Sequence, residues 1–66
     1  MDWNDVYFFT VLVETGTLTA AAERLDVQHN TVSRRIARFE QHLEVRLFDR
    51  IGKRYLLTDD GRRIYR

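Results

Sequence analysis

The fold is decided by residues 17–43, which are TLTAAAERLDVQHNTVSRRIARFEQHL. In the first part of this stretch, apolar side chains follow one another at intervals of 3, 1 and 3 residues, which predicts the buried face of a short helix. In the second part the intervals are 4, 3 and 4 residues, which predicts the buried face of a longer helix. These two apolar sets are Leu18, Ala21, Ala22 and Leu25, and then Val32, Ile36, Phe39 and Leu43.

Only Asp26, Val27 and Gln28 separate the two helices, which leaves no room for another element. A short helix, a turn of about three residues and a longer helix form a helix-turn-helix. Ala21 and Ala22 support this prediction, because small side chains let the second helix approach closely at a steep angle. We expect Asp26 to adopt a left-handed conformation in the turn, which aspartate enters at lower cost than most residues.

The face of the longer helix opposite its apolar side carries hydrogen-bond donors and arginines and no acid. Side chains of this kind can bond to base edges and phosphates in a major groove, which indicates a nucleic-acid interface. The alternative interpretation is an ordinary solvated face, which fits most charged helices. The residues on this face and its flank are His29, Asn30, Ser33, Arg34, Ala37, Arg38 and Gln41.

The composition indicates one small domain. The 66 residues, 44% of them hydrophobic, are enough for a single core and leave little room for an active-site cleft. There is no cysteine, and the two histidines, His29 and His42, lack a carboxylate cluster, so we expect no metal or other cofactor in this domain. No apolar run reaches membrane-spanning length, which predicts a soluble, cytoplasmic protein without a membrane partner.

The charge is distributed unevenly along the chain. The formal net charge of +1 hides a balance of −4 over residues 1–23, which contain four acids and no base. All eleven arginines and lysines lie in residues 24–66, where the balance is +5. This asymmetry gives a positive field to the part of the chain that follows the first helix, as a nucleic-acid partner requires.

A further helix is predicted over residues 3–15, before the helix-turn-helix. Asp2 is a suitable N-cap, Asp5 favours the positive end of the helix, and Gly16 can close it in a left-handed conformation. We expect Thr17 to cap the helix that follows. The predicted core stripe of residues 3–15 consists of Trp3, Val6, Phe9 and Val13, widened by Tyr7, Leu12 and Phe8.

After the longer helix, residues 47–50, 51–54 and 55–57 predict a strand, a turn and a second strand. A hairpin this small must pack against the helices, so its apolar residues Leu47, Phe48 and Leu57 should face the core. Its tip is basic, which predicts a wing that touches the DNA backbone or the minor groove. The alternative is a basic turn that only keeps the domain soluble. The basic residues of the tip are Arg50, Lys53 and Arg54.

Thr58 and the two acids after it predict the start of another helix. The sequence stops soon afterwards without a C-cap, so we interpret the chain as truncated inside that helix. The predicted organisation is a mainly α, three-helix winged helix-turn-helix with a two-stranded β-hairpin wing over residues 1–58. Residues 59–66 would then be the beginning of a linker helix.

The sequence resembles the N-terminal DNA-binding domain of LysR-type transcriptional regulators over essentially all 66 residues. Each matching piece is short, and their order and spacing together make the resemblance specific. The pieces are Phe9, Thr17-Leu18, Ala21-Ala22-Glu23-Arg24-Leu25, Val27, Val32-Ser33-Arg34, Ile36, Glu40, Val45-Arg46-Leu47-Phe48-Asp49-Arg50, Leu57-Thr58 and Gly61.

The resemblance implies sequence-specific binding of double-stranded DNA by a bacterial, cytoplasmic transcriptional regulator. It also implies a linker helix that pairs two subunits into a homo-oligomer, and a C-terminal domain that senses a small-molecule inducer. Both would lie mostly or wholly beyond Arg66.

The sequence departs from the family at the start of the longer helix. Gln28, His29 and Asn30 stand where the family usually has Ser-Gln-Pro, so the serine N-cap is replaced by a weaker one. Asn30 can bond adenine in bidentate fashion. Glu44 replaces the glycine that usually follows this helix. The expected DNA-binding residues are Gln28, His29, Asn30, Thr31, Ser33, Arg34, Arg38, Arg50, Lys53 and Arg54.

Two alternatives belong to other functional classes. The first is a helical protein-interaction module without DNA binding, which would show acids or an exposed apolar stripe on the outward face. The second is an enzyme, because His29 and Ser33 lie four residues apart and could form part of a nucleophilic pair. Neither an acid that would orient the histidine nor a glycine-rich anion hole accompanies this pair, so we expect no enzyme.

Overall fold

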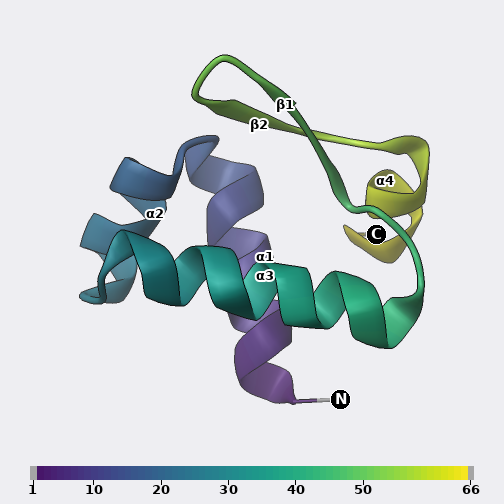
Figure 1. The fold of residues 1–66 in the computed structure, drawn as a ribbon, viewed down its shortest axis with the longest axis horizontal. Coiled ribbons are helices and arrows are strands. Elements are labelled where there is room, and N and C mark those ends of the chain that lie inside the picture. Colours follow the sequence, from purple (N-terminus) through teal and green to yellow (C-terminus); the bar gives the residue numbers. More distant parts are fainter. Residues whose placement is uncertain (1, 66) are drawn as a thin grey trace.

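The computed structural model describes residues 2–65, in which a helix-turn-helix crosses a first helix and carries a two-stranded hairpin (Figure 1). The predicted mainly α, winged helix-turn-helix fold is confirmed. Among the described residues, no helix has the length and apolar character needed to cross a membrane. The elements in order are α1 (Trp3–Thr15), α2 (Leu18–Leu25), α3 (His29–Leu43), β1 (Phe48–Ile51), β2 (Arg54–Leu57) and α4 (Asp59–Tyr65).

The helix ends follow the predicted local chemistry. Asp2 caps α1 by accepting a hydrogen bond from the Asn4 N–H at 3.0 Å, and Thr17 caps α2 through the Ala20 N–H at 3.1 Å. Gly16 closes α1 with φ of 80°, and Asp26 forms the turn of the helix-turn-helix with φ of 57°. Both residues are left-handed, as predicted.

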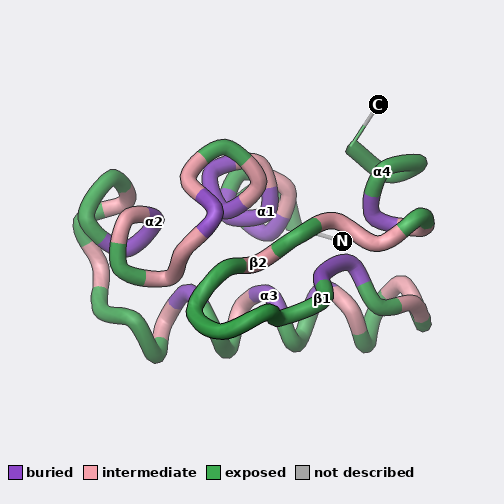
Figure 2. Tube along the Cα trace, turned by 90° about the horizontal axis from the view of Figure 1, so that it is seen from above, coloured by how far each residue is buried: buried purple, intermediate pink, exposed green. Residues whose placement is uncertain are grey.

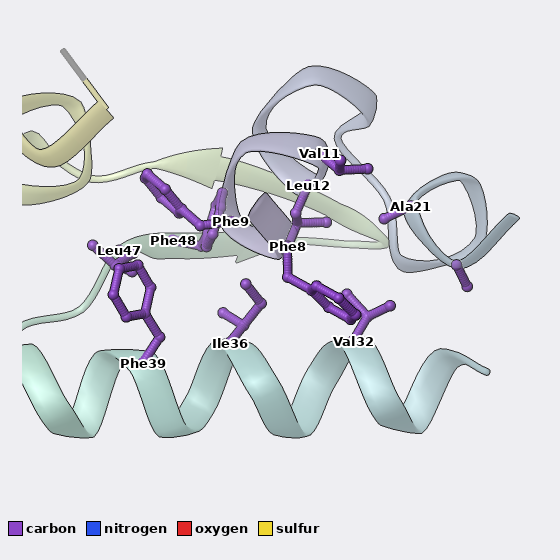
Figure 3. Close-up of a cluster of buried hydrophobic side chains, with 11 residues drawn as sticks. Phe8, Phe9, Val11, Leu12, Ala21, Val32, Ile36, Phe39, Leu47 and Phe48 are labelled. Carbon is purple, nitrogen blue, oxygen red and sulfur yellow. The ribbon is translucent and has the colours of Figure 1, made fainter. Parts of the chain in front are cut away.

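The core lies where α3 crosses α1 (Figure 3). Val32, Ile36 and Phe39 point from α3 toward α1, and each is at most 4% exposed. Phe9 lies at the centre of an aromatic cluster, with ring centroids 5.8 Å from Phe39 and 5.5 Å from Phe48. Tilted and edge-to-face pairs at these separations contribute more than the burial of their area alone.

The predicted core stripe of α1 was wrong at its N-terminal end. Trp3 is 84% exposed and Tyr7 is 55% exposed, whereas Phe8 is only 8% exposed. At the N-terminal end of α1, the side that carries Trp3 and Tyr7 stays exposed, whereas the side that carries Asp5 is buried. Because most of α1 is apolar, its sequence fits two overlapping stripes, and the one that is buried contains Asp5, Phe8, Phe9 and Leu12.

The hairpin exists as predicted, and its turn is shorter than expected. Antiparallel pairing runs from Phe48 opposite Leu57 to Ile51 opposite Arg54, so only Gly52 and Lys53 form the loop. Gly52 has φ of 62°, which suits the first position of a two-residue hairpin loop. The predicted turn over residues 51–54 is therefore corrected, and Arg54 belongs to β2 rather than to the tip.

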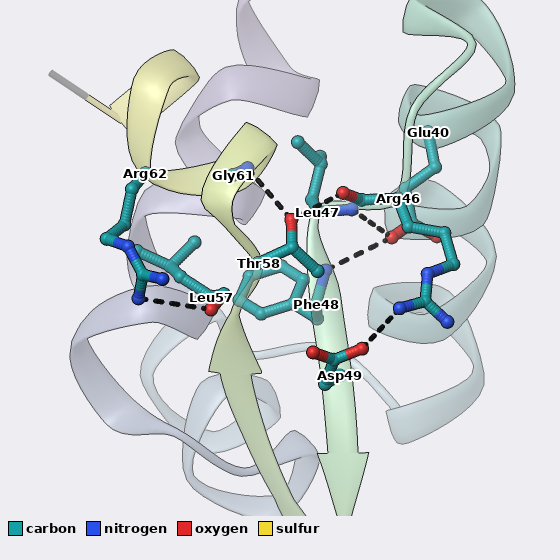
Figure 4. Close-up of polar contacts among 9 residues, drawn as sticks. All are labelled: Glu40, Arg46, Leu47, Phe48, Asp49, Leu57, Thr58, Gly61 and Arg62. Atoms are coloured by element: carbon teal, nitrogen blue, oxygen red, sulfur yellow. Dashed lines mark hydrogen bonds and ion pairs between the residues drawn. The ribbon is translucent and has the colours of Figure 1, made fainter.

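A polar joint connects the hairpin to α4 (Figure 4). The Thr58 hydroxyl donates to the Arg46 carbonyl at 2.6 Å and accepts from the Gly61 N–H at 2.9 Å, which confirms Thr58 as the cap of α4. Gly61 is buried against Leu47, and a Cβ there would overlap the Leu47 carbonyl oxygen and lie 2.8 Å from Leu57 Cδ2. Only glycine allows α4 to approach the Leu47 backbone this closely.

We expect Gly61→Ala to destabilise the domain, although alanine is the better helix former. Helix propensity alone would stabilise α4 by about 1 kcal/mol, whereas the overlap with the Leu47 backbone should cost more than this, up to roughly 3 kcal/mol. Urea unfolding followed by circular dichroism would measure the difference. Arg63→Ala, at an exposed position of the same helix, is the control. A Gly61→Ala midpoint at or above the parent's would contradict the close approach.

Candidate nucleic-acid interface

The outward face of α3 is exposed along its length, opposite the buried side that packs on α1 (Figure 2). His29, Asn30, Ser33 and Arg34 are exposed, while Thr31 is half-buried at the edge of this face. The predicted division of α3 into a core side and an outward side is confirmed.

The N-terminal end of α3 has no side-chain cap. Gln28 occupies the N-cap position, and its carbonyl accepts from Thr31 at 3.0 Å and from Val32 at 3.3 Å, but its side chain makes no cap hydrogen bond. The first N–H groups of α3 are therefore left for solvent or a ligand. The partial positive charge of a helix N-terminus favours an anion at such a position.

The three basic residues predicted for the wing differ in their surroundings. Lys53 lies in the loop at the tip, and Arg50 stacks on Tyr55, with its guanidinium carbon 5.1 Å from the ring centroid. Arg54 turns back toward α1 instead. Its guanidinium lies so close to Gly16 that a Cβ added there would be 3.1 Å from Arg54 Nη2. Arg54 therefore lies against the C-terminal end of α1, where the helix dipole favours a cation.

The wing and the start of α3 face a shared hollow of about 410 Å³. The Tyr55 N–H donates to the Gly16 carbonyl at 2.7 Å, which ties β2 to the end of α1 and holds the wing beside α2. The hollow brings His29 of α3 together with Arg50 and Lys53 of the wing, although these residues are far apart in sequence. Its lining residues are Thr17, Leu18, Thr19, His29, Arg50, Lys53 and Tyr55.

A second hollow, of about 370 Å³, lies on the surface of α3 and is lined by Thr31, Arg34, Arg35 and Arg38. Arg34 folds along the helix, with its Nε donating to the Asn30 carbonyl at 3.3 Å. Arg35 was missed by the sequence prediction. Its guanidinium lies over the Phe8 ring, 5.0 Å from the centroid, and 30% of its side chain remains exposed.

The outward face of α3 itself carries no acid, but Asp5 of α1 reaches two arginines at its edge. Asp5 is 5% exposed, and its carboxylate accepts from Arg38 Nη2 at 3.0 Å and from Arg35 Nη1 at 3.5 Å. These partners are 30 and 33 residues away along the chain, so no local spacing indicates the contact. Asp5 was expected only to favour the positive end of α1.

Glu40 fixes the wing to α3 (Figure 4). Its Oε2 accepts from the Leu47 N–H at 2.7 Å and from the Phe48 N–H at 3.4 Å, at the point where the chain enters β1. Glu44 takes φ of 59° in the turn between them and occupies the left-handed position in place of a glycine. No role was predicted for Glu40, because its acceptor function depends on backbone groups seven and eight residues away.

An exposed, donor-rich helix with a basic wing beside it defines a winged helix-turn-helix domain. The chain matches the family model described as bacterial regulatory helix-turn-helix protein, lysR family, over residues 3–62. It belongs to this lysR family, and the family resemblance predicted from the sequence is confirmed.

Individual relatives agree with this assignment. An HTH-type transcriptional regulator in the ibpB-leuC intergenic region of Azotobacter vinelandii is 47% identical over 62 residues, which cover 94% of this chain and 43% of the relative. The crystal structure of the CbnR_DBD–DNA complex superposes with a TM-score of 0.94 at 29% identity, covering 98% of this chain and 75% of that one.

The full-length structure of AphB, a virulence activator from Vibrio cholerae and a member of the LTTR family, also matches. Its TM-score is 0.92 at 32% identity, with 98% of this chain and 22% of AphB covered. The chain thus spans less than half the length of these curated relatives, 43% of the Azotobacter vinelandii regulator and 21% of the HTH-type transcriptional regulator YybE of Bacillus subtilis.

We expect Glu40→Ala to destabilise the domain by about 1–3 kcal/mol, because it leaves the buried Leu47 N–H without an acceptor. Glu40→Gln should destabilise the domain less, since its amide oxygen can still accept a hydrogen bond from the Leu47 N–H. Urea unfolding would measure both, with Gln41→Ala at the exposed neighbouring position as the control. If Glu40→Ala and Gln41→Ala unfold at the same midpoint, Glu40 does not hold the wing.

Proposed function

We propose that this chain is the sequence-specific, double-stranded DNA-binding domain of a LysR-type transcriptional regulator, with α3 in the major groove. The observation that supports this most is the pair of basic hollows beside the exposed side of α3. Arg34, Arg35 and Arg38 line one, and Arg50 and Lys53 line the other. A helix seated in a major groove has a phosphate backbone on either side, so basic side chains are needed on both flanks.

We assign base reading to the first turn of α3, because the N-terminal residues of a recognition helix lie deepest in the groove. Asn30 and His29 would set base preference, and Thr31 and Ser33 would bond bases or phosphates nearby. Gln28 would contact the backbone at the uncapped helix end.

The remaining assignments concern the backbone. Arg34 and Arg38 would bind phosphates and fix the register of α3, while Arg50 and Lys53 of the wing would touch the backbone or the minor groove. Arg54 would support the wing against α1 and contribute less to the DNA contact. The support from relatives is the TM-score of 0.94 with CbnR_DBD, which was crystallised with DNA.

For the whole protein, we propose that the helix begun by α4 continues and pairs two subunits, and that a C-terminal domain binds a small-molecule inducer. We propose a cytoplasmic regulator without catalytic activity, with His29 and Ser33 serving as groove contacts. A protein-interaction module is less well supported, because the outward face of α3 carries arginines rather than an apolar stripe.

We expect Asn30→Ala to relax base preference at one or two base pairs by roughly 1–3 kcal/mol, while binding to unrelated duplexes changes little. A selection over randomised duplexes with each variant would measure this. Gln41→Ala removes an amide from the far end of the same helix and serves as the control. Identical sequence profiles for Asn30→Ala and the parent would show that other residues read the bases.

Lys53 in the loop of the wing and Arg54 in β2 should respond differently to substitution. We expect Lys53→Ala to weaken specific and unrelated duplexes by similar factors and to flatten the salt dependence by about one counterion unit. Arg54→Ala should leave that slope nearly unchanged and lower the melting temperature instead. Titration at several salt concentrations, together with thermal melts, would distinguish them. Equal slope changes for the two variants would contradict the placement of Arg54 against α1.

A further inference from the structure

Asp5 is the only charged residue buried within residues 2–65. It lies on the side of α1 that otherwise carries Phe8, Phe9 and Leu12, where an apolar residue would satisfy the fold. A carboxylate in such a place needs a charged partner, and it finds two in α3. Arg38 Nη2 is 3.0 Å from its Oδ1, and Arg35 Nη1 is 3.5 Å away.

The contact restricts Arg35 and Arg38 to different degrees. Arg35 is held from three sides, by Asp5, by Asp2 at 3.7 Å and by the Phe8 ring beneath its guanidinium. Arg38 is tethered at one nitrogen only, and 59% of its side chain remains exposed. A guanidinium has five N–H donors, so Arg38 keeps free donors that can bind a phosphate in a direction set by Asp5.

The three arginines around the 370 Å³ hollow are therefore not equivalent. Arg34 has no acidic partner among the described residues, and its charge is uncompensated. The charges of Arg35 and Arg38 are balanced by Asp5 and Asp2. The hollow is less positive than three arginines would make it, and two of its three guanidinium groups have a fixed direction.

We propose, building on the DNA binding proposed above, that Asp5 is a specificity-determining residue that acts through Arg38 and Arg35. A guanidinium held in one direction meets a phosphate only when α3 is seated in one register, whereas a free arginine adapts to a phosphate in any register. Because acids balance the charges of Arg38 and Arg35, these two arginines also add less to the attraction between the domain and any duplex, whatever its sequence. Asp5 thus lowers binding to unrelated DNA more than it lowers binding to the operator.

The main test is Asp5→Asn, which keeps the shape of the side chain and removes its charge. We expect binding to unrelated duplexes to rise about three- to tenfold and the salt dependence to steepen by up to about one counterion unit. Binding to a selected duplex should change less, so the ratio of specific to unrelated binding should fall.

Glu14→Gln is the matched control for Asp5→Asn. It makes the same charge change in the same helix and also removes the carboxylate of an ion pair, with Arg24 at 2.7 Å. Glu14 lines none of the hollows described above. We expect it to leave the ratio of specific to unrelated binding within about twofold of the parent's.

A second comparison uses the arginines and does not depend on how well Asp5→Asn folds. Arg34→Gln, at the uncompensated arginine, should weaken specific and unrelated duplexes by similar factors and flatten the salt slope by about one unit. Arg38→Gln leaves Asp5 paired with Arg35 and should weaken the selected duplex at least threefold more than the unrelated one. Circular dichroism melts would confirm that each variant is folded.

The outcomes separate this proposal from the proposed function. If the parent chain binds no duplex even at low salt, DNA binding itself is wrong. If the parent binds, but Asp5→Asn and Glu14→Gln change both duplexes equally, Asp5 adds only general charge and the inference is overturned. Equal effects of Arg34→Gln and Arg38→Gln on the two duplexes would also overturn it.

Discussion

The packing of Phe9 is the interaction on which the rest of the domain depends. Its ring, which is 2% exposed, meets Phe39 of α3, Phe48 of β1 and Tyr65 of α4, with centroids between 5.5 and 6.1 Å away. One side chain of α1 thus contacts α3, β1 and α4. A domain of 66 residues has one small core, and this cluster lies where the elements of that core meet, so their relative placement depends on it.

Polar contacts then set the position of the surface that this core supports. Glu40 holds the entry to β1 against α3, the Gly16 carbonyl accepts from the Tyr55 N–H of β2, and Thr58 links the exit of the hairpin to α4. Each contact satisfies a backbone group that would otherwise be left unpaired at an element boundary. Together they hold the wing at both of its ends, so the basic groups of Arg50 and Lys53 keep a defined distance from α3.

The parts of this arrangement that depend on local chemistry could be predicted from the sequence. The two faces of α3, the caps at Asp2 and Thr17 and the left-handed turn at Asp26 each involve residues within about one helical turn. Trp3 was misplaced because a helix that is apolar at most positions has no unique stripe, and its partner helix decides which side is covered. The contact of Asp5 with Arg38 could not be predicted, because it joins two helices whose crossing angle and rotation are set by the core.

The exposure of Trp3 has a consequence for spectroscopy. It is the only tryptophan in the chain, and at 84% exposure its indole already has a largely aqueous environment in the folded state. Its emission should therefore shift little when the core melts. The same indole lies at the first residue of α1, on its exposed side, rather than among the rings around Phe9. Tryptophan fluorescence in this domain is thus a local signal from the N-terminal end of α1, and loss of the fold is visible in the far-ultraviolet dichroism of its helices.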